Sequence, residues 1–249
     1  MKYLLEITFL GTAYYGFQVQ KGKELPTIQG TVQNAVCGVF GKKYPVTGCS
    51  RTDRGVHAKQ FFLTVDTGSD RISIPSDRIP AAMNAVLPDD IAVKSAKTVP
   101  DSFHPRYTEM EKEYVYLFDN GKTRSPFDAG RAYYVPRPVR DELMDQAAKR
   151  IEGKHDFTSF MAAGSKIIDA VRTVTSCRVT REGDRVLLTV SADGFLYNMV
   201  RIIAGTLLAV SDGKILPEEI PDIIAAKDRS RAGATLPPDG LYLNRVTYF

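Results

Sequence analysis

One short segment of the chain gathers side chains that can do chemistry. It runs from residue 48 to 58 and reads Gly-Cys-Ser-Arg-Thr-Asp-Arg-Gly-Val-His-Ala. Asp53 lies between Arg51 and Arg54, and two guanidinium groups beside a carboxyl group favour its ionised form. An ionised carboxylate can act as a nucleophile or as a general base, and loops held by rigid elements often carry such groups. Asp53 is therefore a candidate catalytic carboxylate that needs support from elsewhere in the sequence.

The residues alone leave a structural alternative open for the same segment. A short polar side chain such as that of Asp53 often bonds its own backbone in an Asx turn. His57, near the end of the segment, is more typical of a structural hydrogen-bonding residue than of a general acid. We therefore leave His57 out of the predicted catalytic set.

Arg201 is the second residue whose surroundings point to chemistry. It is the one charged residue in the apolar run from residue 195 to 205. An unpaired guanidinium is costly to bury, whereas a carboxylate in a bidentate pair would satisfy it and would itself be oriented. Asp53 is one candidate partner. The alternatives are a structural acid such as Asp193, or an arginine side chain that extends to solvent.

Periodic patterns predict the elements that position these residues. Strand patterns occur at 3–10, 61–66, 91–96, 113–118 and 241–249, and a hairpin signature joins 176–180 to 186–191. Helical patterns occur at 28–40, 79–86, 139–151, 196–210 and 217–227, the first with Thr27 as its N-cap and Gly41 at its end. The order indicates two successive units of mixed strands and helices. We divide the chain into domains 1–104 and 105–249.

The composition fits a globular chain of this kind. The 249 residues are 43% hydrophobic and 25% charged, which suffices for one large or two small cores. The net charge of +4 permits a polyanionic partner without identifying one. Three widely spaced cysteines fit a reduced chain better than a disulfide framework, and no apolar run is long enough to span a bilayer. We expect a cytoplasmic protein without a membrane partner.

The sequence resembles the TruA family of tRNA pseudouridine synthases. The segment 50–58 is similar to the family signature, which carries its catalytic aspartate at the position of Asp53. Further blocks follow in the family's order, namely Gly16-Phe17-Gln18, Thr27-Ile28-Gln29, Phe103-His104-Pro105-Arg106, Lys112-Glu113-Tyr114-Val115-Tyr116, His155-Asp156-Phe157, Met199-Val200-Arg201, Ala226-Lys227-Asp228-Arg229 and Gly240-Leu241-Tyr242-Leu243. The departures from the family pattern, at Cys49, Arg54 and Pro105, remove no catalytic group.

The resemblance implies the reaction and the residues that carry it. Such an enzyme detaches uracil from the ribose at N1 and rejoins it through C5, a redox-neutral isomerisation that needs no cofactor and no metal. Asp53 would be the catalytic carboxylate, Arg201 would hold it by an ion pair, and Tyr114 would stack on the uracil and help to remove the C5 proton. Arg51 would contact the RNA around the extruded nucleotide, or would only be a helper cation for Asp53. Tyr114 has the alternative of being a core aromatic residue, because residues 114, 116 and 118 share one face of a strand.

The resemblance also implies a fold, a substrate and partners. Two similar halves, each RRM-like or ferredoxin-like, would form a continuous, mainly antiparallel α/β sheet with helices packed on one side and a central active-site cleft. The substrate would be uridine at positions 38, 39 and 40 in the anticodon stem and loop of tRNA, and the enzyme would be a homodimer. Basic residues would grip the RNA backbone, among them Arg106, Arg172, Lys227, Arg229 and Arg231. The alternatives are a pseudouridine synthase acting on another RNA, and a catalytically silent tRNA-binding protein of the same fold.

Overall fold

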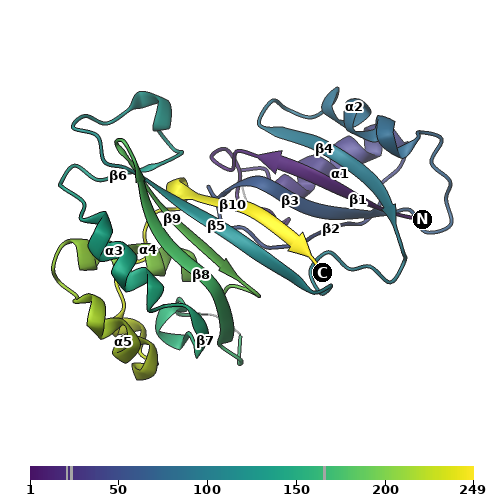
Figure 1. Ribbon diagram of the computed structural model, residues 1–249. Helices are drawn as coiled ribbons and strands as arrows, with labels where there is room; N and C mark the ends of the chain where they lie inside the picture. The colour runs from purple at the N-terminus through teal and green to yellow at the C-terminus, as the bar shows by residue number, and fades with distance from the viewer. Residues whose placement is uncertain (21, 23–24, 165–166) are drawn as a thin grey trace. The chain divides into compact units, whose positions relative to one another are not determined.

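The computed structural model describes residues 1–20, 22, 25–164 and 167–249. The chain divides into two compact units, one made of Met1–Met110 with Leu243–Phe249 and the other of Glu111–Tyr242. Each unit combines a mainly antiparallel sheet with helices (Figure 1), which confirms the predicted mixed α/β class. Asp53 belongs to the first unit, whereas Tyr114 and Arg201 belong to the second. In the described part of the chain, no helix is long and apolar enough to cross a membrane.

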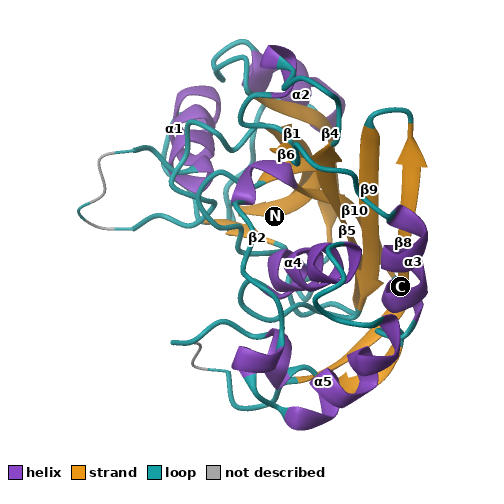
Figure 2. Ribbon diagram, turned by 90° about the vertical axis from the view of Figure 1, so that its left-hand side faces the viewer, coloured by secondary structure: helices purple, strands orange, loops and turns teal. Residues whose placement is uncertain are grey.

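The first unit is a sheet with helices on one face. Its strands lie in the order β4 (Ile91–Val99), β1 (Lys2–Phe9), β3 (His57–Asp66) and β10 (Leu241–Tyr248), and β2 (Val46–Gly48) also pairs with β3. The pairs β1–β3, β1–β4 and β2–β3 are antiparallel. The helices α1 (Ile28–Phe40) and α2 (Ile79–Asn84) lie on the same side of β1 and β4 (Figure 2). A short 3-10 turn, Ser76–Arg78, leads into α2.

The packing of this unit follows from alternation along β1. Leu5 and Ile7 are fully buried, and Tyr3 contacts the ring of Phe40 on α1 edge to face. Successive side chains of a strand point to opposite faces, so these odd-numbered residues form the face that packs on the helices. The predicted strands 3–10, 61–66 and 91–96 are therefore confirmed in type and place.

The second unit holds the remaining strands and, among its described residues, three α-helices. The strands lie in the order β5 (Met110–Asp119), β9 (Arg185–Ala192), β8 (Val171–Glu182) and β7 (Gly153–Asp156), and β6 (Tyr133–Tyr134) pairs in parallel with the end of β5. The helix α3 (Asp141–Lys149) packs against β8, α4 (Met199–Ser211) packs beside α3, and α5 (Ile220–Ala226) follows (Figure 1). Further 3-10 turns occur at Pro126–Asp128, Thr158–Phe160, Pro217–Glu219, Arg229–Arg231 and Pro238–Gly240.

Two predicted features with clear turn and cap chemistry are confirmed. α1 begins after Thr27, whose hydroxyl accepts a hydrogen bond from the Gly30 N–H at 3.2 Å, and ends at Gly41 with a φ of 82°. The β8–β9 hairpin turns through Gly183, whose φ is 61°.

Other predictions differ from the structure at element ends. β3 begins at His57, so the last two residues of the segment 48–58, predicted to be a loop, already belong to a strand. α3 covers Asp141–Lys149, two residues shorter at each end than the predicted helix 139–151, and it buries Met144, Ala147 and Ala148. Val139 and Ile151, the ends of the predicted helix, are buried outside it. Just before the helix, the Arg140 N–H donates to Ser211 Oγ at 2.8 Å. The strands β2, β6 and β7 were not predicted, because two to four residues are too short to show alternation.

Candidate active site

The segment that carries Asp53 is a turn held by backbone hydrogen bonds. The Val56 N–H donates to the Asp53 carbonyl at 3.2 Å and closes the turn. The loop around residues 14–17 packs against this turn through two backbone hydrogen bonds. The Phe17 N–H donates to the Thr52 carbonyl at 3.1 Å, and the Gly55 N–H donates to the Tyr14 carbonyl at 3.4 Å. Backbone hydrogen bonds thus close the turn and join it to the preceding loop. The Asp53 side chain is half-buried.

A glycine makes this close approach of two loops possible. Gly16 has a φ of 73°, and a Cβ built on it would lie 2.4 Å from the Thr52 carbonyl oxygen and 3.1 Å from the Asp53 carbonyl carbon. Both the backbone conformation and the lack of space exclude a side chain. This contact gives a physical reason for the Gly16-Phe17-Gln18 block beside the signature segment.

His57 and Gly48 fix the two ends of the segment. His57 is fully buried, and its Nδ1 accepts a hydrogen bond from the Gly11 N–H at 3.0 Å. The prediction that His57 is a structural hydrogen-bonding residue is confirmed. At the other end, a Cβ on Gly48 would lie 2.5 Å from ring atoms of Phe17, so the chain passes directly under that ring.

Positive charge surrounds the turn. Arg51 and Arg54 are both exposed, and the Arg54 guanidinium lies over the Tyr15 ring at 5.7 Å from its centroid. Arg106 approaches from the far end of the unit's sequence and donates from Nη2 to the Gly48 carbonyl at 3.3 Å. These exposed or half-buried cations suit a polyanionic ligand.

Thr52 was missed by sequence reasoning, and no pattern in the sequence indicates its environment. Its side chain is 8% exposed, and its hydroxyl oxygen is buried without a hydrogen-bond partner among the described residues. Buried hydroxyl groups are normally satisfied, so an unsatisfied one next to a candidate catalytic residue marks a place where a ligand or water can bond.

In the second unit, Tyr114 lies on β5 and is 6% exposed. Its ring packs edge to face on Phe195, with the centroids 5.0 Å apart. Tyr116 and Phe118 follow on the same face of the strand, with their ring centroids 4.9 Å apart. The Tyr116 hydroxyl donates to the Pro237 carbonyl at 2.7 Å, and burial raises the pKa of this hydroxyl far above its usual value. Tyr116 is thus a structural residue.

Arg201 lies in the first turn of α4 and is half-buried. Its Nε donates to the Leu236 carbonyl at 2.6 Å and its Nη1 to Asn198 Oδ1 at 2.7 Å. These bonds fix the plane of the guanidinium. The alternative partner Asp193 accepts a hydrogen bond from the Thr173 N–H at 3.0 Å. The ion pair of Arg201 with Asp53 stays a prediction.

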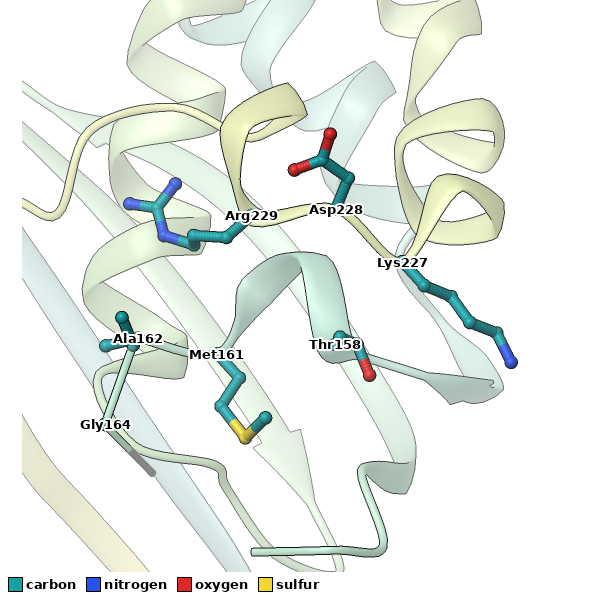
Figure 3. A pocket seen from close by; sticks show the side chains of 8 residues that line it. Thr158, Met161, Ala162, Gly164, Lys227, Asp228 and Arg229 are labelled. Carbon is teal, nitrogen blue, oxygen red and sulfur yellow. The ribbon is translucent and has the colours of Figure 1, made fainter. Parts of the chain in front are cut away.

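A pocket of about 350 Å³ lies in the second unit (Figure 3). It is lined by Thr158, Met161, Ala162, Ala163, Gly164, Lys227, Asp228 and Arg229. Arg229 and Lys227 point away from each other (Figure 3), and Lys227 has a φ of 51°, which is unusual for a residue other than glycine. Lys227 Nζ lies 2.8 Å from Asp156 Oδ2, and this contact, followed by the Thr158 hydroxyl, lowers the pKa of Asp156. The lining thus combines apolar residues with two basic residues and the acidic Asp228.

Comparison with known proteins identifies the class. A family model described as tRNA pseudouridine synthase matches residues 7–108 and 147–248. The chain is 43% identical over 245 residues to the tRNA pseudouridine synthase A of Caldicellulosiruptor bescii, with 98% of each chain covered. It is 42% identical over 250 residues to the tRNA pseudouridine synthase A of Bacillus subtilis, with 100% of this chain and 99% of that protein covered.

The chain therefore belongs to the tRNA pseudouridine synthase family, a family of isomerases. The predicted family is confirmed. Arg51, Asp53 and Arg201 lie within the matched ranges, whereas Tyr114 lies between them. Among solved structures, the chain is similar to one in the crystal structure of a Cbf5-Nop10-Gar1 complex, at 15% identity and a TM-score of 0.38. That similarity covers 83% of this chain and 44% of that one, so this chain spans less than half of its length.

Proposed function

We propose that this protein converts uridine to pseudouridine at positions 38, 39 and 40 of the anticodon stem and loop of tRNA. The observation that carries the proposal is the Asp53 turn, which is built from backbone bonds and flanked by exposed arginines. Full-length similarity to two proteins named tRNA pseudouridine synthase A supports the same reaction. The enzyme is proposed to act in the cytoplasm as a homodimer.

Asp53 is the proposed catalytic carboxylate. In the overall reaction the bond from uracil N1 to ribose C1′ breaks, a bond from C5 to C1′ forms, and a proton leaves C5 while N1 gains one. Atoms and electrons balance without an oxidant or a donor group. A carboxylate serves this reaction by attacking the ribose or the base, or by taking the C2′ proton, and each route requires Asp53 to be ionised. Its neighbours Arg51 and Arg54 provide for that state.

Three further residues have proposed roles around Asp53. Arg201 orients the carboxylate through an ion pair, with its own plane fixed by Leu236 and Asn198. Tyr114 stacks on the uracil and its hydroxyl assists removal of the C5 proton. Arg51 contacts the RNA around the flipped nucleotide, whose extrusion from a stem costs a few kcal/mol.

The tRNA backbone is held by basic side chains outside this set. The pocket of Figure 3 is one such place, because Lys227 and Arg229 line it beside an apolar floor. Phosphate contacts of this kind give affinity without sequence information.

The test uses unmodified tRNA that carries tritium at C5 of uridine. We expect the protein to release tritium and to leave pseudouridine at positions 38, 39 and 40. Release from other positions only would favour a synthase with a different RNA target. Tight binding without any release would favour the catalytically silent binding protein.

A further inference from the structure

We propose that Tyr107, supported by His104, is a stacking platform for a nucleobase of the RNA substrate next to the reacting uridine. This inference rests on the proposed function only in taking RNA as the substrate. It concerns the block Phe103-His104-Pro105-Arg106 and the residue that follows it, to which the catalytic scheme above assigns no role.

The two rings form a stack that is open on one side. Their centroids are 4.3 Å apart and their planes are inclined by 25°. Tyr107 is 77% exposed although its inner face is covered by His104, so its outer face is open to solvent. An exposed aromatic face on a rigid support is the surface on which an unpaired base stacks in single-stranded RNA recognition.

The support is rigid and uncharged. The Tyr107 and Thr108 N–H groups both donate to the His104 carbonyl, at 3.2 and 3.0 Å, and close a turn. His104 Nδ1 accepts a hydrogen bond from the Arg106 N–H at 3.1 Å, which fixes the plane of the imidazole ring. Burial, and then the charges of Arg106 and Lys2, lower the pKa of His104, so the ring is neutral at pH 7. A neutral, fixed ring holds Tyr107 in place for a ligand.

Arg106 ties the platform to the catalytic segment. Its Nη2 donates to the carbonyl of Gly48, the residue at which that segment begins. Its Nε is buried and has no hydrogen-bond partner among the described residues. A second cation lies close by, because Lys2 Nζ donates to the Phe103 carbonyl at 3.0 Å. An exposed aromatic face with two cations bonded nearby, one of them to the start of the segment that carries Asp53, suits a nucleotide with its base on Tyr107 and its phosphate near Arg106.

The first experiment uses the fact that the chain contains no tryptophan. Tyr107→Trp creates a single fluorescent reporter on the platform, and unmodified tRNA is titrated into this variant. We expect strong quenching of the tryptophan fluorescence on saturation, because a stacked base quenches an indole ring. The matched control is Phe127→Trp, at a residue of the second unit that is 82% exposed. The proposal would be overturned if both variants were quenched equally, or if the fluorescence of Tyr107→Trp did not change on addition of tRNA.

The second experiment separates stacking from charge. Tyr107→Ala should weaken tRNA binding about tenfold, while Tyr107→Phe should bind as the wild type does. The slope of log Kd against log salt concentration should be the same in all three proteins, because no phosphate contact is lost. A slope that falls by about one in the alanine variant, or unchanged affinity, contradicts stacking.

The two proposals fail in different ways. Wild-type protein that releases no tritium from tRNA refutes the proposed function. Wild-type protein that releases tritium normally, together with a Tyr107→Ala variant of unchanged affinity and turnover, refutes the platform alone. Because Tyr107 is largely exposed, its replacement leaves the core intact, and equal unfolding midpoints of wild type and variants verify this.

Discussion

At the scale of single residues, Asp53, the proposed catalytic carboxylate, lies on a turn that backbone hydrogen bonds hold. The N–H groups of Phe17, Gly55 and Val56 donate these bonds, and the exposed Arg51 and Arg54 flank Asp53 in the sequence. The neighbourhood of two arginines and one carboxylate at 51, 53 and 54 can be predicted from the sequence, because these residues are adjacent along the chain. The close contact of Gly16 with the backbone of Thr52 and Asp53 cannot be predicted, since it depends on two loops that meet only in the folded unit.

Gly16→Ala tests this contact. The new methyl group would meet the Thr52 carbonyl at 2.4 Å in a backbone conformation with a φ of 73°. We expect a loss of about 2 to 4 kcal/mol in the free energy of unfolding and a fall in kcat, because the Asp53 turn is displaced. Gly41→Ala is the control. Gly41 has a φ of 82°, but no described atom lies within 4 Å of a Cβ added there, so this variant should lose only about 1 kcal/mol in the free energy of unfolding. Equal losses in urea unfolding would show that the contact contributes nothing.

Tyr114→Phe tests the proposed proton transfer. The ring and its contact with Phe195 remain, so stacking and folding should persist, whereas the hydroxyl is lost. We expect kcat to fall by about 10² or more with tRNA affinity unchanged, as for removal of a general acid or base. Tyr134→Phe removes a hydroxyl that donates to the Lys122 carbonyl at 3.4 Å, away from the proposed site residues, and should keep wild-type kcat. Full activity of Tyr114→Phe in the tritium assay would limit that residue to packing.

At the scale of elements, local chemistry decides what the sequence predicts. The limits of α1 are predicted from Thr27 and Gly41, because capping acts within a few residues. The short strands β2, β6 and β7 exist only because a longer strand lies beside each, so no pattern of their own reveals them. Likewise, the bond from the Arg140 N–H, just before α3, to Ser211 Oγ joins residues distant in the sequence, so no local pattern reveals it.

An ion pair at the end of α4 predicts a pH-dependent stability. Arg137 Nε and Nη2 donate to the two carboxylate oxygens of Asp212 at 2.6 and 2.9 Å, and this contact is the main cause that lowers the pKa of Asp212. A lowered folded pKa stabilises the fold above the unfolded value of about 3.9, and the contribution is lost as the pH falls through the folded value. Arg137 is 46% exposed, so solvent screening limits the effect to about 1 kcal/mol.

Arg137→Gln should therefore lower the free energy of unfolding by about 1 kcal/mol at pH 7, and the difference should shrink below about pH 4. Urea unfolding at pH 7, 5, 4 and 3 measures it. Asp77→Asn is the control, because that carboxylate lies 3.8 Å from Arg78 and is 77% exposed. A difference that is constant over this pH range would exclude the ion pair as its source.

At the scale of the whole molecule, long-range pairing decides the division of the chain. Residues 243–249 belong to the first unit, where the Val246 N–H donates to Gln60 Oε1 at 2.9 Å and the Tyr248 hydroxyl to the Pro105 carbonyl at 2.7 Å. A strand pattern at 241–249 is visible in the sequence, but its partners are not. The predicted domains 1–104 and 105–249 are continuous stretches of the chain. They therefore cannot include a C-terminal segment that packs with the N-terminal unit.

The proposed binding of tRNA by basic side chains can be tested at Arg229, which lines the pocket of the second unit. Arg229→Gln should weaken binding about threefold to tenfold and reduce the slope of log Kd against log salt by about one, because one phosphate contact is lost. Arg78→Gln removes a charge from a side chain that is 78% exposed and lies far along the sequence in the other unit, and should change neither quantity. An unchanged slope in Arg229→Gln would remove the pocket from the RNA-binding surface.

The most direct test of the account is the activity of Asp53→Asn on tRNA labelled with tritium at C5 of uridine. Asparagine keeps the size of the side chain but cannot act as a nucleophilic carboxylate or as a base. We predict no detectable tritium release, with tRNA affinity within about tenfold of the wild type, or about 1.4 kcal/mol, because binding rests on many cations. Asp77→Asn should release tritium as the wild type does. Release by Asp53→Asn at a rate near that of the wild type would contradict the assignment of Asp53 as the catalyst.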